Sequence, residues 1–224
     1  MWFQKNKWKI ITSVLIIVVL AISFYFGGNA PGSKGWEIPS NTASDSAVVN
    51  GMEISSGTGK DQYLTDPVPE GKPAPVEPQD VTIGTTAYTC TISISCSTIL
   101  NNMDLCDPDK VDLVPEDGWI LYPLVVTFYE GESVFNVLQR VCKQKKIHME
   151  FENTPIYNSA YIEGIHNLYE FDVGELSGWM YQVNGWFPNY GCSRYQLRDG
   201  DVIEWVYTCD LGRDVGGGYA VGDK

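Results

Sequence analysis

The sequence predicts an α+β protein, in which a mixed β-sheet packs against one main helix behind a transmembrane helix and a disordered stalk. Three observations support this. An uncharged apolar run stands near the N-terminus, a Ser-, Gly- and Pro-rich stretch follows it, and the rest alternates between strand-like and helix-like patterns. We therefore divide the chain into residues 1–26, 27–87, 88–209 and a disordered tail, 210–224.

The apolar run, residues 10–26, carries no charge and directly follows three lysines. Its length is at the lower limit for crossing a bilayer, and lysines flank the cytoplasmic end of such segments. We expect an uncleaved signal anchor in the cell membrane, with the N-terminus cytoplasmic and the remaining chain extracellular. A removed signal peptide is the alternative, but Pro31 would follow the small residues at the cleavage position and obstruct the peptidase.

The predicted stalk, residues 27–87, lacks any hydrophobic period. Its first part is rich in Ser and Gly, and residues 67–75 contain a proline at nearly every second position. Gly/Ser-rich chains are flexible, whereas proline-rich ones are extended and stiffer. Such a stretch buries too little apolar surface to offset the entropy lost on ordering.

The folded domain is expected to begin at residue 88 with two strands. Residues 89–96 alternate strictly, so one face of this strand should be apolar. That face consists of Cys90, Ile92, Ile94 and Cys96. A polar, acidic stretch at 99–117 favours a short helix and loop, and residues 120–129 predict the second strand.

One amphipathic helix follows these strands. Ser133 is a favourable N-cap, and the apolar residues from Val134 to Cys142 recur at helical spacing. The helix should end near Ile147, after lysines whose charge suits a helix C-terminus.

The second half of the domain is expected to be mostly β-structure. Residues 148–151 form a short strand in this interpretation. The tyrosine-rich stretch 153–177 contains only one plausible strand, around 169–171. Residues 153–161 at its start are read as a polar, aromatic loop, and loops of this length in compact domains are often functional.

The last strands follow an Asn-Gly turn. Residues 179–183 lead into Asn184-Gly185, a strong hairpin signal, with a return strand beginning at Trp186. The turn at 199–201 leads into the last strand, 202–207. Two strands, a helix and three more strands predict a β-grasp-like mixed sheet whose first and last strands are parallel neighbours.

Three motifs resemble a known family when taken in order. They are EGESVFNVL (130–138), GWMYQVNG (178–185) and YQLRDGDVIEW (195–205). Residues 88–208 look like the bacterial transcobalamin-like domain family, related to the C-terminal domain of transcobalamin and intrinsic factor. The resemblance implies a β-grasp-like fold and a binding role, with cobalamin or a related corrinoid as a candidate ligand. Those carriers hold the corrinoid between this domain and an α-helical barrel, which this sequence lacks.

Aromatic residues are the candidate ligand contacts. Trp179 and Tyr181 are expected to pack in the core, whereas the aromatic residues after the Asn-Gly turn are expected to be exposed. A second group lies in the polar loop 153–161. Exposed aromatic rings stack on flat ligands or sugars. The candidates are Trp186, Phe187, Tyr190, Tyr157 and Tyr161. Purely structural packing is the alternative for both groups.

Six cysteines lie beyond the predicted anchor, which favours disulfides in an exported domain. Parallel first and last strands would bring Cys96 near Cys209 at one end and Cys90 near Cys192 at the other. Cys106 and Cys142 remain as a third pair or as free thiols. Zinc binding is disfavoured because there is no C-x-x-C pair and only two histidines.

Charge and motifs limit the function classes. A net charge of −13 repels phosphate backbones, so nucleic acid is not an expected partner. No nucleophile elbow, metalloprotease helix or phosphate loop is present, and the absence of C-x-x-C disfavours a thiol–disulfide enzyme. We expect an extracellular binding module without catalysis, required cofactor or metal. The alternative is a structural or adhesive cell-envelope component that binds a protein or a glycan.

Overall fold

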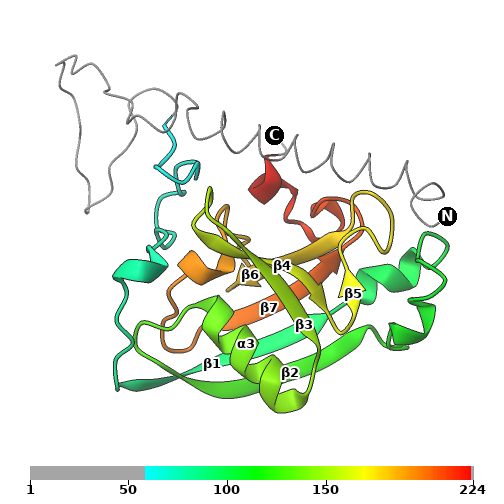
Figure 1. The fold of residues 1–224 in the computed structure, drawn as a ribbon, viewed down its shortest axis with the longest axis horizontal. Helices are drawn as coiled ribbons and strands as arrows, with labels where there is room; N and C mark the ends of the chain where they lie inside the picture. Colours follow the sequence, from blue (N-terminus) through cyan, green and yellow to red (C-terminus); the bar gives the residue numbers. More distant parts are fainter. Residues whose placement is uncertain (1–58, 223–224) are drawn as a thin grey trace, which may run out of the picture. The chain divides into compact units, whose positions relative to one another are not determined.

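The computed structural model describes residues 59–222 (Figure 1). The predicted membrane anchor and residues 27–58 of the predicted stalk lie outside these residues. Within the described range, no helix combines the length and apolar character needed to cross a bilayer.

The central element is a four-stranded mixed sheet with the order β2-β1-β7-β6. Its strands are β1 (Ala87–Ser95), β2 (Trp119–Tyr129), β6 (Gly178–Val183) and β7 (Val202–Thr208). Strand β1 pairs antiparallel with β2 and parallel with β7, and β7 pairs antiparallel with β6. The predicted α+β fold and its parallel first and last strands are therefore confirmed.

Strand β1 is covered on both faces. The alternating apolar face predicted from the sequence is buried, with Cys90, Ile92, Ile94 and Cys96 inaccessible or nearly so. On the opposite face, Ser93 and Ser95 are buried as well, and Ser95 Oγ donates to the carbonyl of Gly118 at 3.2 Å. Strand β1 thus lies in the interior, between an edge strand and β7.

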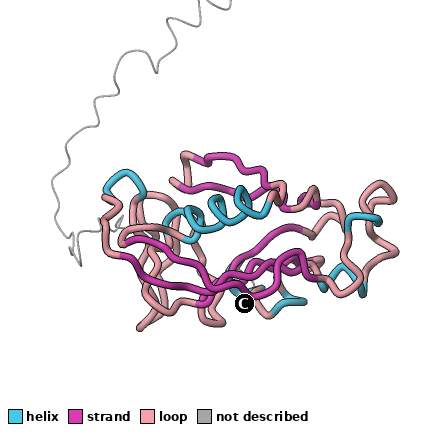
Figure 2. Tube along the Cα trace, turned by 90° about the horizontal axis from the view of Figure 1, so that it is seen from below, coloured by secondary structure: helices cyan, strands magenta, loops and turns pink. Residues whose placement is uncertain are grey.

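The one α-helix within residues 59–222, α3 (Val134–Lys145), begins and ends where the sequence predicts. Ser133 caps it in a capping box with Asn136, and Lys146 ends it in the left-handed conformation (φ 57°). The buried stripe predicted by the helical spacing is confirmed; it comprises Val134, Val137, Leu138, Val141 and Cys142. Figure 2 shows α3 lying over one face of the sheet.

A second, three-stranded sheet has the order β3-β4-β5. It comprises β3 (Met149–Thr154), β4 (Ser159–Ile165) and β5 (Leu168–Tyr169). The prediction of a single strand within residues 153–177 is therefore wrong. Most of β4 is buried, so it lacks the polar alternation of a half-exposed strand. Its hairpin turn depends on Asn158 in the left-handed region (φ 47°), a less distinctive signal than Asn-Gly.

The predicted turn after β6 is present, but its return strand is not. Asn184 and Gly185 both have positive φ, as the two central residues of a type I′ hairpin turn require. The pairing of β6 with the residues after this turn consists of one bridge, between Val183 and Trp186. Pro188, two residues later, has no N–H to continue the ladder.

Short 3₁₀ turns connect these elements. The predicted helix-and-loop stretch holds η2 (Ser97–Asn101) and η3 (Val111–Leu113), and η4 (Cys192–Arg194) precedes β7. The others are η1 (Pro78–Asp80), η5 (Arg213–Val215) and η6 (Gly218–Val221).

Segments expected to be disordered lie on the domain at both of its ends. Residues 59–86 hydrogen-bond to the domain, for example from the Val76 N–H to the Arg194 carbonyl at 2.9 Å. Residues 210–222 pack against β6 so closely that a Cβ on Gly212 would lie 2.7 Å from Met180 Sδ. The structure therefore differs from an expected domain of residues 88–209, because these segments cover buried side chains that the sheets leave open.

The predicted disulfides are not formed, and all six cysteines are free. The β1–β7 register explains why Cys96 and Cys209 do not form a disulfide. Its last pair is Ser95 with Val206, so Cys209 lies two residues beyond the position opposite Cys96. That offset is about 6.6 Å along a strand, in addition to the spacing between strands, and exceeds the reach of a disulfide.

Candidate functional site

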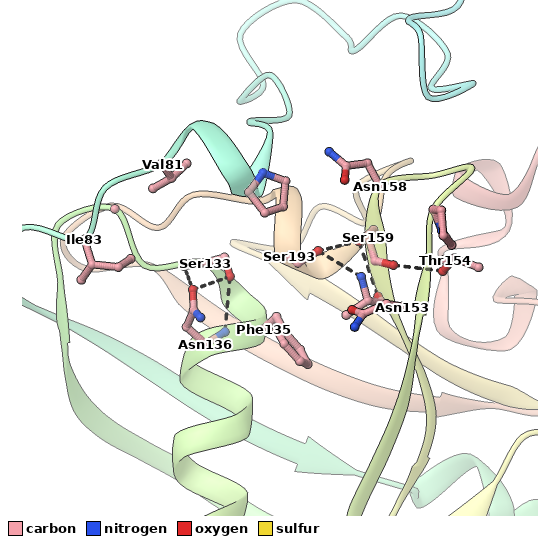
Figure 3. A pocket seen from close by; sticks show the side chains of 14 residues that line it. Val81, Ile83, Ser133, Phe135, Asn136, Asn153, Thr154, Asn158, Ser159 and Ser193 are labelled. Carbon is pink, nitrogen blue, oxygen red and sulfur yellow. Dashed lines mark hydrogen bonds between the residues drawn. The ribbon is translucent and has the colours of Figure 1, made fainter. Parts of the chain in front are cut away.

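The candidate site is a cleft of about 530 Å³, which we call the hairpin cleft (Figure 3). Three parts of the chain form its walls: residues 78–83 before β1, the N-terminal end of α3, and the turn between β3 and β4. Ser193 of η4 completes it. These parts are distant in sequence and meet only in the folded domain.

The helical wall is organised by the capping box of α3. Asn136 Oδ1 accepts hydrogen bonds from the Ser133 N–H at 2.9 Å and from Ser133 Oγ at 2.8 Å. Ser133 Oγ in turn accepts from the Asn136 N–H at 3.3 Å. The amide nitrogen Nδ2 of Asn136 has no partner among the described residues, so it is a donor available to a ligand.

The hairpin wall is held by hydroxyl groups. Ser159 Oγ and Ser193 Oγ lie 2.9 Å apart, and Ser193 Oγ accepts from the Ala160 N–H at 3.0 Å. Thr154 Oγ1 donates to the carbonyl of Ser159 at 3.0 Å, which closes the hairpin end. The Asn153 side chain is exposed and unpartnered among the described residues, so it provides a second free amide.

Asn158 joins the hairpin turn to the segment before β1. Its Nδ2 donates to a carboxylate oxygen of Glu77 and, at 2.9 Å, to Gln79 Oε1. The opposing walls of the cleft are therefore connected by side chains.

The chemical character of the cleft is neutral. None of the residues that line it is charged, although the chain is strongly acidic. Apolar surface comes from Val81, Ile83 and Phe135, and hydroxyl and amide groups supply the polar contacts. Apolar walls with a few polar groups are typical of small-molecule sites. In residues 59–222, no cluster of His, Cys, Asp and Glu is arranged to hold a metal ion.

The predicted tyrosines lie in a neighbouring cavity of about 590 Å³ rather than in the hairpin cleft. Tyr157, Tyr161 and Tyr190 all line this tyrosine cavity, so the structure brings three of the five predicted residues together. Tyr157 is 51% and Tyr161 47% exposed. The Tyr161 hydroxyl donates to the Glu170 carboxylate, and burial together with that carboxylate raises the pKa of Tyr161.

The expected exposure of Trp186, Phe187 and Tyr190 is wrong, because all three are buried. Lys72 Nζ lies 5.4 Å from the centre of the Trp186 ring. The Tyr190 hydroxyl donates to the carbonyl of Pro73 at 2.7 Å. Segments outside the expected domain thus cover this surface.

Phe187 is covered from the other end of the chain. Its N–H donates to the Tyr219 hydroxyl at 3.0 Å, and the two rings make an edge contact. Core packing of Trp179 and Tyr181, in contrast, is confirmed: the first donates to the Leu168 carbonyl and the second to the Tyr190 carbonyl, both at 2.8 Å.

Sequence reasoning missed most of the hairpin cleft. It identified Ser133 as a helix cap but assigned no ligand contact to Asn136, Asn153 or Ser193. The signal for Asn136 was its position three residues after the cap, where its side chain closes a capping box. Asn153 opens the polar loop 153–161 that the sequence marks as a candidate, but the prediction placed the contacts on its tyrosines. Nothing local marks Ser193, whose hydrogen-bond partners Ser159 and Ala160 lie in β4.

The buried cysteine thiols are poorly suited to act as nucleophiles. Burial raises the pKa of Cys96, Cys142 and Cys192 to about 12, so these thiols remain protonated at neutral pH. A protonated thiol is a weak nucleophile, which disfavours a thiol–disulfide enzyme.

Comparisons with known proteins agree with the predicted domain. Residues 131–209 match a family described as "Domain of unknown function (DUF4430)". This range includes α3, the three-stranded sheet, β6 and β7. No curated protein matches the chain significantly.

Two solved structures are similar to part of the chain. One is haptocorrin in complex with Cbi, with a TM-score of 0.42 and 16% identity, over 56% of this chain and 26% of that one. The other is a protein from Ruminococcus gnavus ATCC 29149, provisionally described as metal-binding, with a TM-score of 0.33 and 14% identity. That match covers 54% of this chain and 96% of the other. The similarity thus spans about a quarter of haptocorrin. Residues 131–209 match the DUF4430 family, and the prediction of a transcobalamin-like domain is confirmed for this part of the chain.

Proposed function

We propose that this domain is a binding module that holds a small neutral ligand in the hairpin cleft and catalyses no reaction. The observation that carries the proposal is the uncharged lining of a 530 Å³ cleft in a protein of net charge −13. Removing a charged ligand from water without a counter-charge is costly, so an uncharged cleft selects neutral groups.

A corrinoid is the first candidate ligand. Its flat ring is apolar and is surrounded by carboxamide groups, which both donate and accept hydrogen bonds. The free Nδ2 of Asn136 and the free amide of Asn153 offer matching partners, and Phe135 offers apolar surface. The family resemblance supports the same ligand class. A cleft of this size would hold one edge of the ring and leave the rest exposed.

The membrane attachment belongs to the same proposal. An uncharged run behind three lysines supports residues 1–26 as an anchor that displays the domain outside the cell. Protease added to intact cells should then remove the domain, and a domain degraded only after lysis would contradict this orientation.

The ligand is tested by titrating the full chain with cyanocobalamin and cobinamide by calorimetry. Asn153→Ala should weaken binding roughly 2- to 12-fold, the effect of one lost hydrogen bond. Asn101→Ala is the matched control, since this amide is also exposed but lies outside the cleft. Absence of corrinoid binding by the unmodified chain would exclude this ligand, and equal affinities of the two variants would exclude this cleft.

A glycan is the second candidate, favoured by the half-exposed rings of Tyr157 and Tyr161 in the tyrosine cavity. Aromatic faces of this kind stack on sugars. Titration with oligosaccharides in the same calorimeter separates the candidates, because Tyr157→Ala should affect only glycan binding.

A further inference from the structure

Residues 61–77, which we call the docking segment, lie against the domain without forming a helix or a strand pairing with it. The segment is rich in proline and carries acidic residues near both ends. In Figure 1 it is the cyan part of the chain that precedes η1. Its contacts converge on η4 and on the aromatic residues after β6.

Arg194 of η4 is the main anchor. Its side chain is 1% exposed, and Nη2 donates to Asp61 Oδ2 at 2.8 Å and to Glu77 Oε1 at 2.7 Å. Nη1 donates to Thr65 Oγ1 at 2.6 Å, and the guanidinium lies 5.2 Å from the Tyr63 ring. Each of these partners belongs to the docking segment. A buried cation that lost them would be uncompensated, so its burial depends on the segment.

The electrostatics of Asp61 agree with this geometry. Burial alone would raise the pKa of Asp61, but hydrogen bonds from Arg194 and the Thr65 N–H, with the charge of Arg194, lower it below its ordinary value. The ionised carboxylate is therefore the form that the domain stabilises.

The aromatic residues receive the proline-rich middle of the segment. The Tyr190 and Tyr195 rings stack with 6.2 Å between centroids, and the Trp186 ring lies 6.1 Å from that of Tyr190. The Tyr190 hydroxyl donates to the carbonyl of Pro73. Aromatic grooves with donors aimed at carbonyls are a recurrent way of binding proline-rich peptides.

We propose that Trp186, Tyr190 and Arg194 form a recognition site for an acidic, proline-rich segment. The chain fills this site with its own residues 61–77, and the same segment of a second copy can replace them. Exchange of an identical element between copies requires no new contacts, since each contact is made again in the partner. The proposal is independent of any small ligand in the hairpin cleft.

Hydrogen exchange on the full chain tests the anchor. Asp61→Asn combined with Glu77→Gln should speed exchange of the Val76 N–H, which is bound to the Arg194 carbonyl, about a hundredfold. Amides of β7 should keep their protection, which shows that the domain is folded. Asp66→Asn is the matched control, because among residues 59–222 the Asp66 carboxylate pairs only with exposed Lys60. Unchanged Val76 exchange in the double variant would overturn the anchor.

A labelled peptide of residues 59–80 then tests recognition between chains. It should bind the double variant at least tenfold more tightly than the unmodified chain, whose own segment competes at high effective concentration. Adding Arg194→Met to the double variant should abolish peptide binding. The double variant carries amides at positions 61 and 77, so this change leaves no buried carboxylate of the chain unpaired. No binding to the double variant, or equal binding after Arg194→Met, would overturn the proposal.

Tyr190→Phe, which removes only the hydroxyl bound to Pro73, should weaken peptide binding severalfold if it is introduced into the double variant.

Discussion

Gly131→Ala should lower the free energy of unfolding by about 3 kcal/mol, whereas Gly200→Ala should lower it by only about 1 kcal/mol. Both glycines have left-handed backbones, with φ of +87° and +84°. A side chain at either position therefore meets a similar conformational penalty. Only Gly131 has neighbours: its added Cβ would lie 2.6 Å from the carbonyl oxygen of Thr82 and 3.2 Å from Val81 Cγ1. No atom lies within 4 Å of the Cβ built on Gly200.

The Thr82 contact is with backbone, so no change of rotamer relieves it. Residues 81–83, which form one wall of the hairpin cleft, must move instead. We therefore expect Gly131→Ala to weaken ligand binding as well as stability. Urea unfolding of both variants and the unmodified chain measures the difference. Equal losses at the two glycines would show that Val81 and Thr82 do not lie against Gly131.

Phe128→Ala should cost about 3–5 kcal/mol of unfolding free energy, and Tyr129→Ala should cost less than about 1 kcal/mol. Phe128 is completely buried, and its ring lies 5.7 Å from that of Tyr88, its cross-strand partner. Tyr129, the next residue on β2, is 44% exposed. Both changes truncate an aromatic ring on the same edge strand.

The comparison of these two variants tests the register of β1 and β2. A one-residue slip would turn every side chain of β2 to the other face and exchange the two effects. Thermal and chemical unfolding of the two variants gives the answer directly. A larger loss for Tyr129→Ala would refute the pairing of Tyr88 with Phe128.

Features that depend on neighbouring residues were predictable from the sequence. The cap at Ser133, the buried stripe of α3, the alternation of β1 and the Asn184-Gly185 turn each arise from interactions within a few positions. Hydrophobic period and turn geometry are properties of a short window, so they leave a readable pattern. The element order then restricted the topology to a mixed sheet with parallel first and last strands.

Features that join distant parts of the chain were not predictable. Trp186 and Tyr190 follow a turn and resemble exposed residues locally, yet Lys72 and Pro73 cover them from more than a hundred positions away. The return strand expected at Trp186 failed for a similar reason: β6 already pairs with β7, and the chain turns away at Pro188.

The sequence by itself determined the helix, the parallel pairing of the first and last strands of the main sheet, and the aromatic composition of the surface after β6. Only the tertiary structure decided which of those aromatic rings are accessible and where a ligand cleft opens. The cleft needs residues 78–83, the end of α3 and the β3–β4 turn at one place, and Arg194 is buried only because Asp61 and Glu77 reach it. Burial and charge compensation are properties of the whole packed chain, since a side chain is desolvated by groups that no short window contains.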